Sequence, residues 1–178
     1  MNNQRNVVLF LASSLDGYIA AKDESLDWLY QVEGEGDNGF SEFYETIDAV
    51  LIGRKTYDWM MKQTNGEFPY QGKTCFVFTR KARQPEEHAT FIHDGIASFV
   101  QQLKAKPGKN IWLVGGGDLL HAFLQQQLVD EIILTIAPVV LGRGIPLFHE
   151  KNSQISLSLK RIRTFNQFAE LHYAVKNG

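Results

Sequence analysis

Short runs of apolar residues recur along the chain and predict the strands of a central sheet. The first run, residues 7–12, reads VVLFLA and does not alternate between apolar and polar positions. Such a run is typical of a strand that is buried on both faces, as in a parallel sheet. Similar short runs predict five further strands at residues 49–52, 74–79, 90–92, 111–114 and 131–137.

Several segments between these runs have the periodicity of amphipathic helices. Residues 40–47 place Phe40, Phe43, Tyr44 and Ile47 on one helical face, at positions i, i+3, i+4 and i+7. The same reasoning predicts helices at residues 55–63, 96–104 and 119–127, and a short helical stretch at residues 26–31. In all, about four helices are expected.

The end of the chain has a different pattern. Residues 155–164 and 168–175 alternate more clearly between apolar and polar positions, and the break at Asn166 and Gln167 predicts an antiparallel hairpin. With this hairpin the chain has eight expected strands. The fold class is therefore α/β, with a mostly parallel central sheet and an antiparallel edge. In such sheets ligands bind at the carboxyl ends of the strands, so candidate chemistry is expected at the strand–helix junctions.

Charge and cysteine content exclude several classes of protein. The 178 residues include 18 Lys and Arg against 20 Asp and Glu, which gives a net charge of −2. A chain so close to neutral has no electrostatic reason to bind nucleic acid. Cys75 is the only cysteine, so intramolecular disulfides and multi-cysteine metal sites are excluded, which fits a reducing cytoplasm.

Length and hydropathy add two expectations. The length predicts one domain over residues 1–178. No apolar run reaches the ~18 residues that a membrane span needs, so no membrane partner is expected. The five histidines show no spacing typical of metal ligands, so no metal is expected either.

The junction after the second strand has the composition of a phosphate-binding turn. Gly53 ends the strand, and Arg54, Lys55 and Thr56 open the next helix. A glycine allows close approach of the backbone, and the unpaired N–H groups of a first helical turn attract anions. Two cations oppose the helix dipole unless an anion is bound. The alternative is that both side chains simply point into solvent.

The junction after the fifth strand is a glycine turn. Gly115, Gly116 and Gly117 precede Asp118 and Leu119 at the start of a helix. No packing requirement for three glycines is evident, whereas a backbone lying against a diphosphate or a flat ring would need them. The third glycine of the Rossmann fingerprint is absent, so the turn predicts a dinucleotide site of another type. The alternative is a tight strand–helix turn with Asp118 as cap.

A third junction follows the strand at residues 74–79. Thr79, Arg80 and Lys81 offer a hydroxyl and two cations, which suit a phosphate monoester. Basic residues at this place favour the 2′-phosphate of NADP, whereas an NAD site tends to carry an acid near the ribose. Taken alone, a strand that ends in Arg-Lys is usually only solvated.

Two acidic residues near the first strand are candidates for chemistry. Asp16 and Gly17 predict a turn. Asp27 precedes Trp28, and a carboxylate in an aromatic-lined cleft would have a raised pKa that suits an acid catalyst. The alternatives are that Asp16 only forms the turn and that Asp27 is a solvated residue of a first helical turn.

Taken together, these motifs resemble the dihydrofolate reductase superfamily. The segments that carry the resemblance are SLDGYIA at 14–20, LDWL at 26–29, IGRKTY at 52–57, VGGG at 114–117 and APVVLGRGIPLF at 137–148. They occur in order and extend over nearly the whole chain. The last segment favours the branch that contains the reductase domain of the riboflavin-biosynthesis deaminase–reductase.

The resemblance implies a three-layer fold with NADPH lying across the sheet, and a turn that often contains a cis Gly-Gly bond. The implied cofactor contacts are Ala12, Gly17, Ile19, Gly53, Arg54, Lys55, Thr56, Thr79, Arg80, Lys81, Gly115, Gly116, Gly117, Asp118 and Leu119. The implied substrate contacts are Ser14, Asp16, Trp28, Leu141 and Gly142.

That branch reduces a ribosylamino pyrimidine to its ribitylamino form by hydride transfer to C1 of the sugar. The zinc motif of the deaminase is absent, so a free-standing reductase is implied. We therefore expect an NADPH-dependent reductase that acts on a small imine or aldose-amine, with the proton supplied by Asp27 or by water. The alternatives are a dihydrofolate reductase and a non-catalytic NADP-binding sensor. The apolar tail hairpin and the family branch also predict a homodimer, and the single cysteine predicts a cytoplasmic location.

Overall fold

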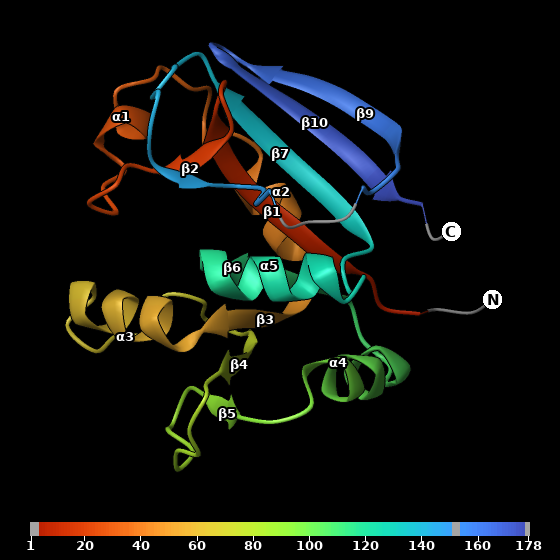
Figure 1. Cartoon of the computed structure of the whole chain (residues 1–178). Coiled ribbons are helices and arrows are strands. Elements are labelled where there is room, and N and C mark those ends of the chain that lie inside the picture. Colours follow the sequence, from red (N-terminus) through yellow and green to blue (C-terminus); the bar gives the residue numbers. More distant parts are fainter. Residues whose placement is uncertain (1–3, 151–153, 177–178) are drawn as a thin grey trace.

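Eight strands form one sheet in the order β5-β4-β3-β6-β1-β7-β10-β9 (Figure 1). The computed structural model describes residues 4–150 and 154–176. The strands of this sheet are β1 (Val7–Ser14), β3 (Ile47–Gly53), β4 (Thr74–Phe78), β5 (Thr90–Ile92), β6 (Asn110–Gly115), β7 (Glu131–Ala137), β9 (Leu157–Phe165) and β10 (Phe168–Val175).

The pairing of the strands confirms the predicted fold class. Neighbouring strands from β5 to β7 are all parallel, because β4 pairs with β5 and β3, β6 pairs with β3 and β1, and β1 pairs with β7 in that sense. The hairpin of β9 and β10 is antiparallel and joins the sheet along β7. The carboxyl ends of the parallel strands therefore lie at one edge of the sheet.

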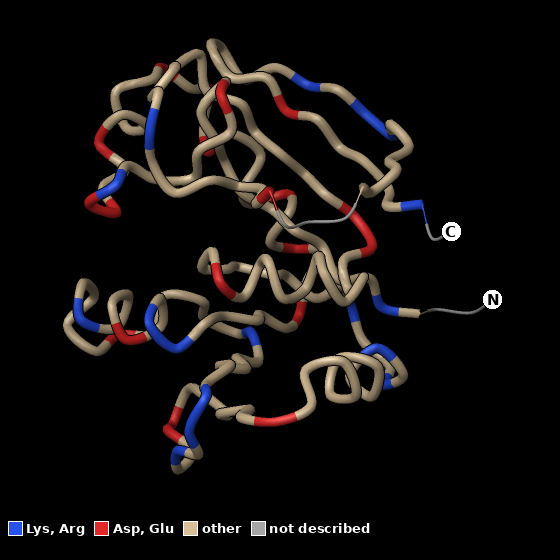
Figure 2. The backbone as a smooth tube through the Cα atoms, in the orientation of Figure 1, with Lys and Arg blue, Asp and Glu red and all other residues tan. Residues whose placement is uncertain are grey.

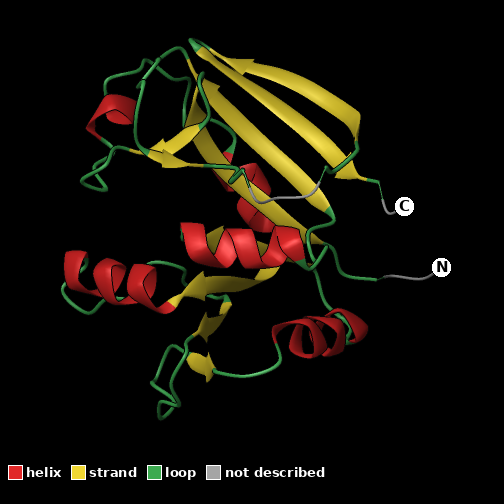
Figure 3. Ribbon diagram, in the orientation of Figure 1, coloured by secondary structure: helices red, strands yellow, loops and turns green. Residues whose placement is uncertain are grey.

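Helices cover both faces of the sheet and make three layers (Figure 3). They are α1 (Asp27–Tyr30), α2 (Phe40–Glu45), α3 (Arg54–Gln63), α4 (Ile96–Ala105) and α5 (Gly117–Gln125). Successive strand residues face opposite sides, so Leu9 packs in the core under α4 and α5, and Val8 in the core under α2 and α3. The described residues contain five helices where about four were expected. The fifth is α1, a helix of four residues within the short helical stretch that the sequence predicted.

Several element boundaries differ from the sequence prediction. Ile47 was expected to end a helix, but it begins β3 and is fully buried. β1 continues to Ser14 because it pairs with β7 as far as Ala137. Pairing with a neighbouring strand decides where a strand begins and ends, and the sequence of one segment does not show this pairing.

A second, two-stranded sheet was not predicted. It pairs β2 (Tyr18–Ala20) with β8 (Ile145–Pro146) in antiparallel fashion. Strands of two and three residues are too short to show a periodicity, so only the folded chain reveals them. This small sheet lies beyond the end of β1 and helps to frame the carboxyl edge (Figure 1).

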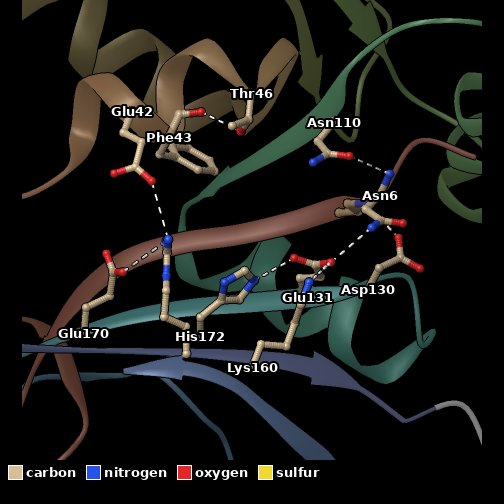
Figure 4. Close-up of polar contacts among 12 residues, drawn as sticks. Asn6, Glu42, Phe43, Thr46, Asn110, Asp130, Glu131, Lys160, Glu170 and His172 are labelled. Carbon is tan, nitrogen blue, oxygen red and sulfur yellow. Dashed lines mark hydrogen bonds and ion pairs between the residues drawn. The ribbon is translucent and has the colours of Figure 1, made fainter. Parts of the chain in front are cut away.

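Polar contacts attach the terminal hairpin to the rest of the fold (Figure 4). Arg163 on β9 donates to Glu42 on α2 (2.6 Å) and to the buried Glu170 on β10 (2.8 Å). Glu131 on β7 contacts Lys160 (2.8 Å) and His172 (2.7 Å). Burial opposes the charge of Glu131, but these two partners outweigh it and lower the pKa of the carboxyl. In the parts of the chain that the structure describes, no helix is long and apolar enough to cross a bilayer.

Candidate active site

The predicted site motifs meet at the carboxyl edge of the sheet. β1, β3, β4 and β6 run parallel and end at Ser14, Gly53, Phe78 and Gly115. The segments at these ends carry the basic turns, the glycine turn and Asp16, and the segment after β7 (Glu131–Ala137) carries Leu141 and Gly142. The fold therefore brings together motifs that lie far apart in the sequence.

The two glycine-containing turns are in contact. A Cβ atom on Gly53 would lie 3.6 Å from the backbone nitrogen of Gly116. A Cβ atom on Gly116 would lie only 2.6 Å from Oγ1 of Thr56, so any side chain at Gly116 would displace the threonine. The structure thus supplies a packing reason for one of the three glycines, which the sequence did not reveal. The peptide bond between Gly115 and Gly116 is cis, as the resemblance implied.

Both helices that start at this contact have open N-termini. Gly53 is the N-cap of α3 and Gly116 the N-cap of α5, and neither helix has a side-chain cap hydrogen bond. The first-turn N–H groups of two helices therefore remain without a capping side chain at one place on the edge of the sheet. This arrangement suits a diphosphate, because each of its two phosphate groups carries a negative charge.

The third junction lies beside the start of α5. Thr79 Oγ1 donates to the carbonyl of Lys81 (3.0 Å), and the amide of Thr79 donates to Ile92 (2.9 Å), so the turn is held by its own contacts. Arg80 is exposed, and its Nη2 lies 3.8 Å from Asp118 on α5. Arg80 and Asp118 were predicted from separate motifs and are neighbours in the fold.

Arg83 is a residue of this region that the sequence reasoning missed. It donates to Asp58 on α3 (3.0 Å) and to Glu86 (2.8 Å), and its guanidinium lies 4.6 Å from the centre of the Phe91 ring. The hydrogen bond that Arg83 donates to Asp58 raises the pKa of Arg83 above its usual value. No spacing rule links positions 58 and 83, so only the folded chain could identify the pair.

Four of the implied substrate residues form one hydrogen-bonded group. The hydroxyl of Ser14 donates to Asp16 (2.6 Å), and the amides of Leu141 (3.0 Å) and Gly142 (2.7 Å) donate to the same carboxylate. The hydrogen bond from Ser14, followed by those from the two amides, lowers the pKa of Asp16. Asp16 therefore anchors the segment after β7 to the end of β1.

Asp27 and Trp28 open α1, near the same edge of the molecule (Figure 1). The side chain of Asp27 is exposed, so it is not the enclosed carboxylate that the sequence suggested. Trp28 is half-buried, and among the described residues its indole N–H has no hydrogen-bond acceptor. The catalytic role of Asp27 stays a prediction.

The residues implied for the nicotinamide lie on β1, on β2 and in the turn between these strands. Ala12 is a half-buried residue of β1, and Ile19 lies on β2. Gly17 has a φ of 84°, and its carbonyl accepts from Leu147 (2.8 Å), which attaches it to the segment after β8. A Cβ atom on Gly117 would lie 3.6 Å from Ile145 of β8. The small sheet therefore joins the glycine turn to the implied substrate residues.

Charges of both signs lie around α3 and the segment between β4 and β5 (Figure 2). Lys55 and Lys81 are exposed cations, whereas Arg54 donates to Asp58 (2.7 Å). Within residues 4–150 and 154–176, no three side chains of His, Cys, Asp or Glu gather closely enough to hold a metal ion.

This strand order, with a glycine turn after β6 and basic turns after β3 and β4, defines a dihydrofolate-reductase-like fold. Comparison with a solved dihydrofolate reductase from Enterococcus faecalis supports that class, with a TM-score of 0.64, 15% identity and 98% of each chain covered. The model of the family "RibD C-terminal domain" matches residues 5–169, and the chain belongs to this family.

Two relatives extend over nearly the whole chain. The uncharacterized protein YwjB of Bacillus subtilis (strain 168) is 49% identical over 171 residues, which cover 96% of this chain and 98% of YwjB. The crystal structure of a candidate riboflavin biosynthesis protein from Shewanella sp. PV-4 has a TM-score of 0.85 and 31% identity, with 97% of this chain and 99% of that chain covered. The family and the fold that the sequence suggested are thus confirmed, and the family is one of riboflavin-pathway-like reductases.

Proposed function

We propose that this protein is an NADPH-dependent reductase that transfers a hydride to a small imine or aldose-amine. A ribosylamino pyrimidine of the riboflavin-biosynthesis type is the substrate that the family favours. The observation that carries the proposal is the contact between Gly53 and Gly116, which brings two uncapped helix N-termini to one place. A basic turn, Thr79 to Lys81, lies beside them.

The residues at this edge fit NADPH. The backbone N–H groups that open α3 and α5 would hold the diphosphate, and the absence of a side chain at Gly116 lets Thr56 and the two turns pack closely together. Arg54, Arg80 and Lys81 would hold the 2′-phosphate, because guanidinium and ammonium groups bind phosphate strongly. The related Enterococcus enzyme was solved in complex with NADP(H), which supports this assignment.

Bound NADPH supplies the hydride, and the task of the chain is to orient the reactants and exclude water. The group formed by Ser14, Asp16 and the amides after β7 is rigidly connected and would form one wall of the substrate site. Asp27 or water would supply the proton. The carboxylate of Asp16 already accepts three hydrogen bonds, so it would hold this wall of the substrate site in place. The backbone of the residues next to Asp16 would contact the substrate.

Titration of the folded protein with NADPH, followed by the change in tryptophan fluorescence, is the direct test. We expect saturable binding in the micromolar range, and turnover with a ribosylamino pyrimidine when NADPH oxidation is followed by absorbance. Absence of NADPH binding by the folded protein would overturn the proposal. Turnover with dihydrofolate in place of the pyrimidine would instead favour a dihydrofolate reductase, and binding without any turnover a sensor.

A further inference from the structure

One carboxylate on α3 links two arginines at the proposed cofactor site. Oδ2 of Asp58 accepts from Nη1 of Arg54 (2.7 Å), and Oδ1 accepts from Nη1 of Arg83 (3.0 Å). Asp58 is the fifth residue of α3, one turn after Arg54. The side chains of Arg54, Asp58 and Arg83 are 43%, 39% and 36% exposed, so a ligand in solution can reach the cluster.

The contacts of Arg83 fix the position of this cluster. Arg83 also donates to Glu86 (2.8 Å), and the hydroxyl of the buried Tyr57 donates to the other oxygen of Glu86 (3.0 Å). These bonds attach the segment after β4 to α3. Arg83 therefore has both terminal nitrogens engaged by acids, whereas only Nη1 of Arg54 is engaged in the described contacts.

A similar pairing occurs on the other helix of the site. Nη2 of Arg80 lies 3.8 Å from Oδ2 of Asp118 in the first turn of α5. Each of the two arginines that the 2′-phosphate would meet thus has a carboxylate beside it. A site built only to attract a phosphate dianion would leave both cations without acidic neighbours.

We propose that Asp58 limits the preference for NADPH over NADH by acting as a counter-charge to Arg54 and Arg83. This inference rests on the proposed function. A guanidinium has five N–H donors, so Arg54 can keep Asp58 and still donate to a phosphate from its free nitrogens. The carboxylate and the 2′-phosphate would then bind one cation and repel each other. NADH carries a neutral hydroxyl at that place, so Asp58 weakens NADPH binding selectively.

Asp58→Asn tests the inference because asparagine keeps the shape of the side chain and one acceptor oxygen but has no charge. We expect NADPH to bind about fivefold more tightly to this variant, the size of effect typical of an exposed charge pair. The affinity for NADH should change less than about twofold, since no second charge is present there. Adenosine 2′,5′-bisphosphate and 5′-AMP serve as probes without nicotinamide, and only the bisphosphate should gain affinity.

Three further measurements separate a charge effect from a structural one. Glu45→Gln removes an exposed acid at the end of α2, near the opposite edge of the sheet, and should leave both affinities unchanged. Glu86→Gln removes the charge of the second acid that Arg83 contacts. It should raise the affinity for NADPH relative to NADH, as Asp58→Asn does, but by a smaller factor. In roughly 1 M salt, where the screening length is about 3 Å, the gain in Asp58→Asn should shrink.

The outcomes distinguish this inference from the proposed function. Weaker NADPH binding by Asp58→Asn, or equal changes for NADPH and NADH, would overturn the counter-charge role and make Asp58 a structural link between α3 and the segment after β4. If wild-type protein binds neither dinucleotide, the proposed function itself is rejected. Thermal unfolding of each variant confirms that the comparison is made between folded proteins.

Discussion

Thr56 and Gly116 meet across the two turns of the proposed cofactor site, and Oγ1 of Thr56 occupies the space that a side chain at position 116 would need. A Cβ atom there would lie 2.6 Å from that oxygen. Gly116→Ala should therefore destabilise the fold by about 1–3 kcal/mol, as overpacking does, and weaken NADPH binding.

Urea unfolding and cofactor titration measure the two effects of Gly116→Ala. Gly53→Ala is the matched control for stability, because its Cβ would make only ordinary contacts of 3.6 Å and more at a φ of −75°. Equal stabilities of the two variants would contradict the steric role of Thr56.

The arginines after β3 and β4 should decide how well the 2′-phosphate is recognised. Arg54→Ala and Arg80→Ala should each weaken the binding of NADPH by roughly fivefold to tenfold, because charge-assisted contacts to the phosphate are lost. The binding of NADH should weaken much less. Lys62→Ala, at the last turn of α3, is the control and should change neither affinity. Equal losses for both dinucleotides in the arginine variants would show that these side chains do not meet the 2′-phosphate.

Asp16 should make the fold sensitive to acid. Three donors lower its pKa below 3.8, so the folded protein holds the ionised form more firmly than the unfolded chain does. The stability from this group is present above the unfolded pKa and is lost as the pH falls through the lower, folded pKa. Melting temperatures of wild type and Asp16→Asn, compared between roughly pH 6 and pH 3, should therefore converge at the acid end. A constant difference would exclude the linkage.

His121 on α5 should also make the fold less stable as the pH falls, but in a higher pH range than Asp16 does. Burial, followed by the neighbouring His149, lowers its pKa from 6.5, so the folded state disfavours the charged ring. As the pH falls below 6.5 the unfolded chain takes up the proton first, and the stability decreases until the folded pKa is passed. The slope of unfolding free energy against pH between roughly pH 7 and pH 5 should be smaller in His121→Leu than in wild type. Parallel profiles would contradict this assignment.

We propose that the outer face of the terminal hairpin pairs with a second copy of the chain. Leu159 and Ile162 on β9 are 53% and 59% exposed and stand opposite Tyr173 and Leu171 on β10. An apolar face is complementary to itself, as a two-fold symmetric interface requires. Light scattering should show a dimer for wild type and a monomer for Ile162→Asp. Tyr30→Asp, an exposed apolar position on α1, is the control and should remain dimeric.

The sequence alone determined the eight strands of the main sheet, the α/β class and the three phosphate-suited turns. These features are local, because buried strands, amphipathic helices and glycine-basic junctions each leave a pattern within about ten residues. The sequence also gives the near-neutral net charge, but a net charge does not show that Arg54 and Arg80 each have an acid beside them.

The tertiary structure decided which of those groups meet. It placed Thr56 against Gly116, Asp58 against Arg83, and Asp16 against the amides of Leu141 and Gly142. These partners are between 25 and 126 positions apart. Such contacts arise when parallel strands bring their ends to one edge, and packing and hydrogen bonding then select the neighbours. A local pattern can therefore identify a turn that suits phosphate, but only the folded chain shows which charges and hydroxyls surround it.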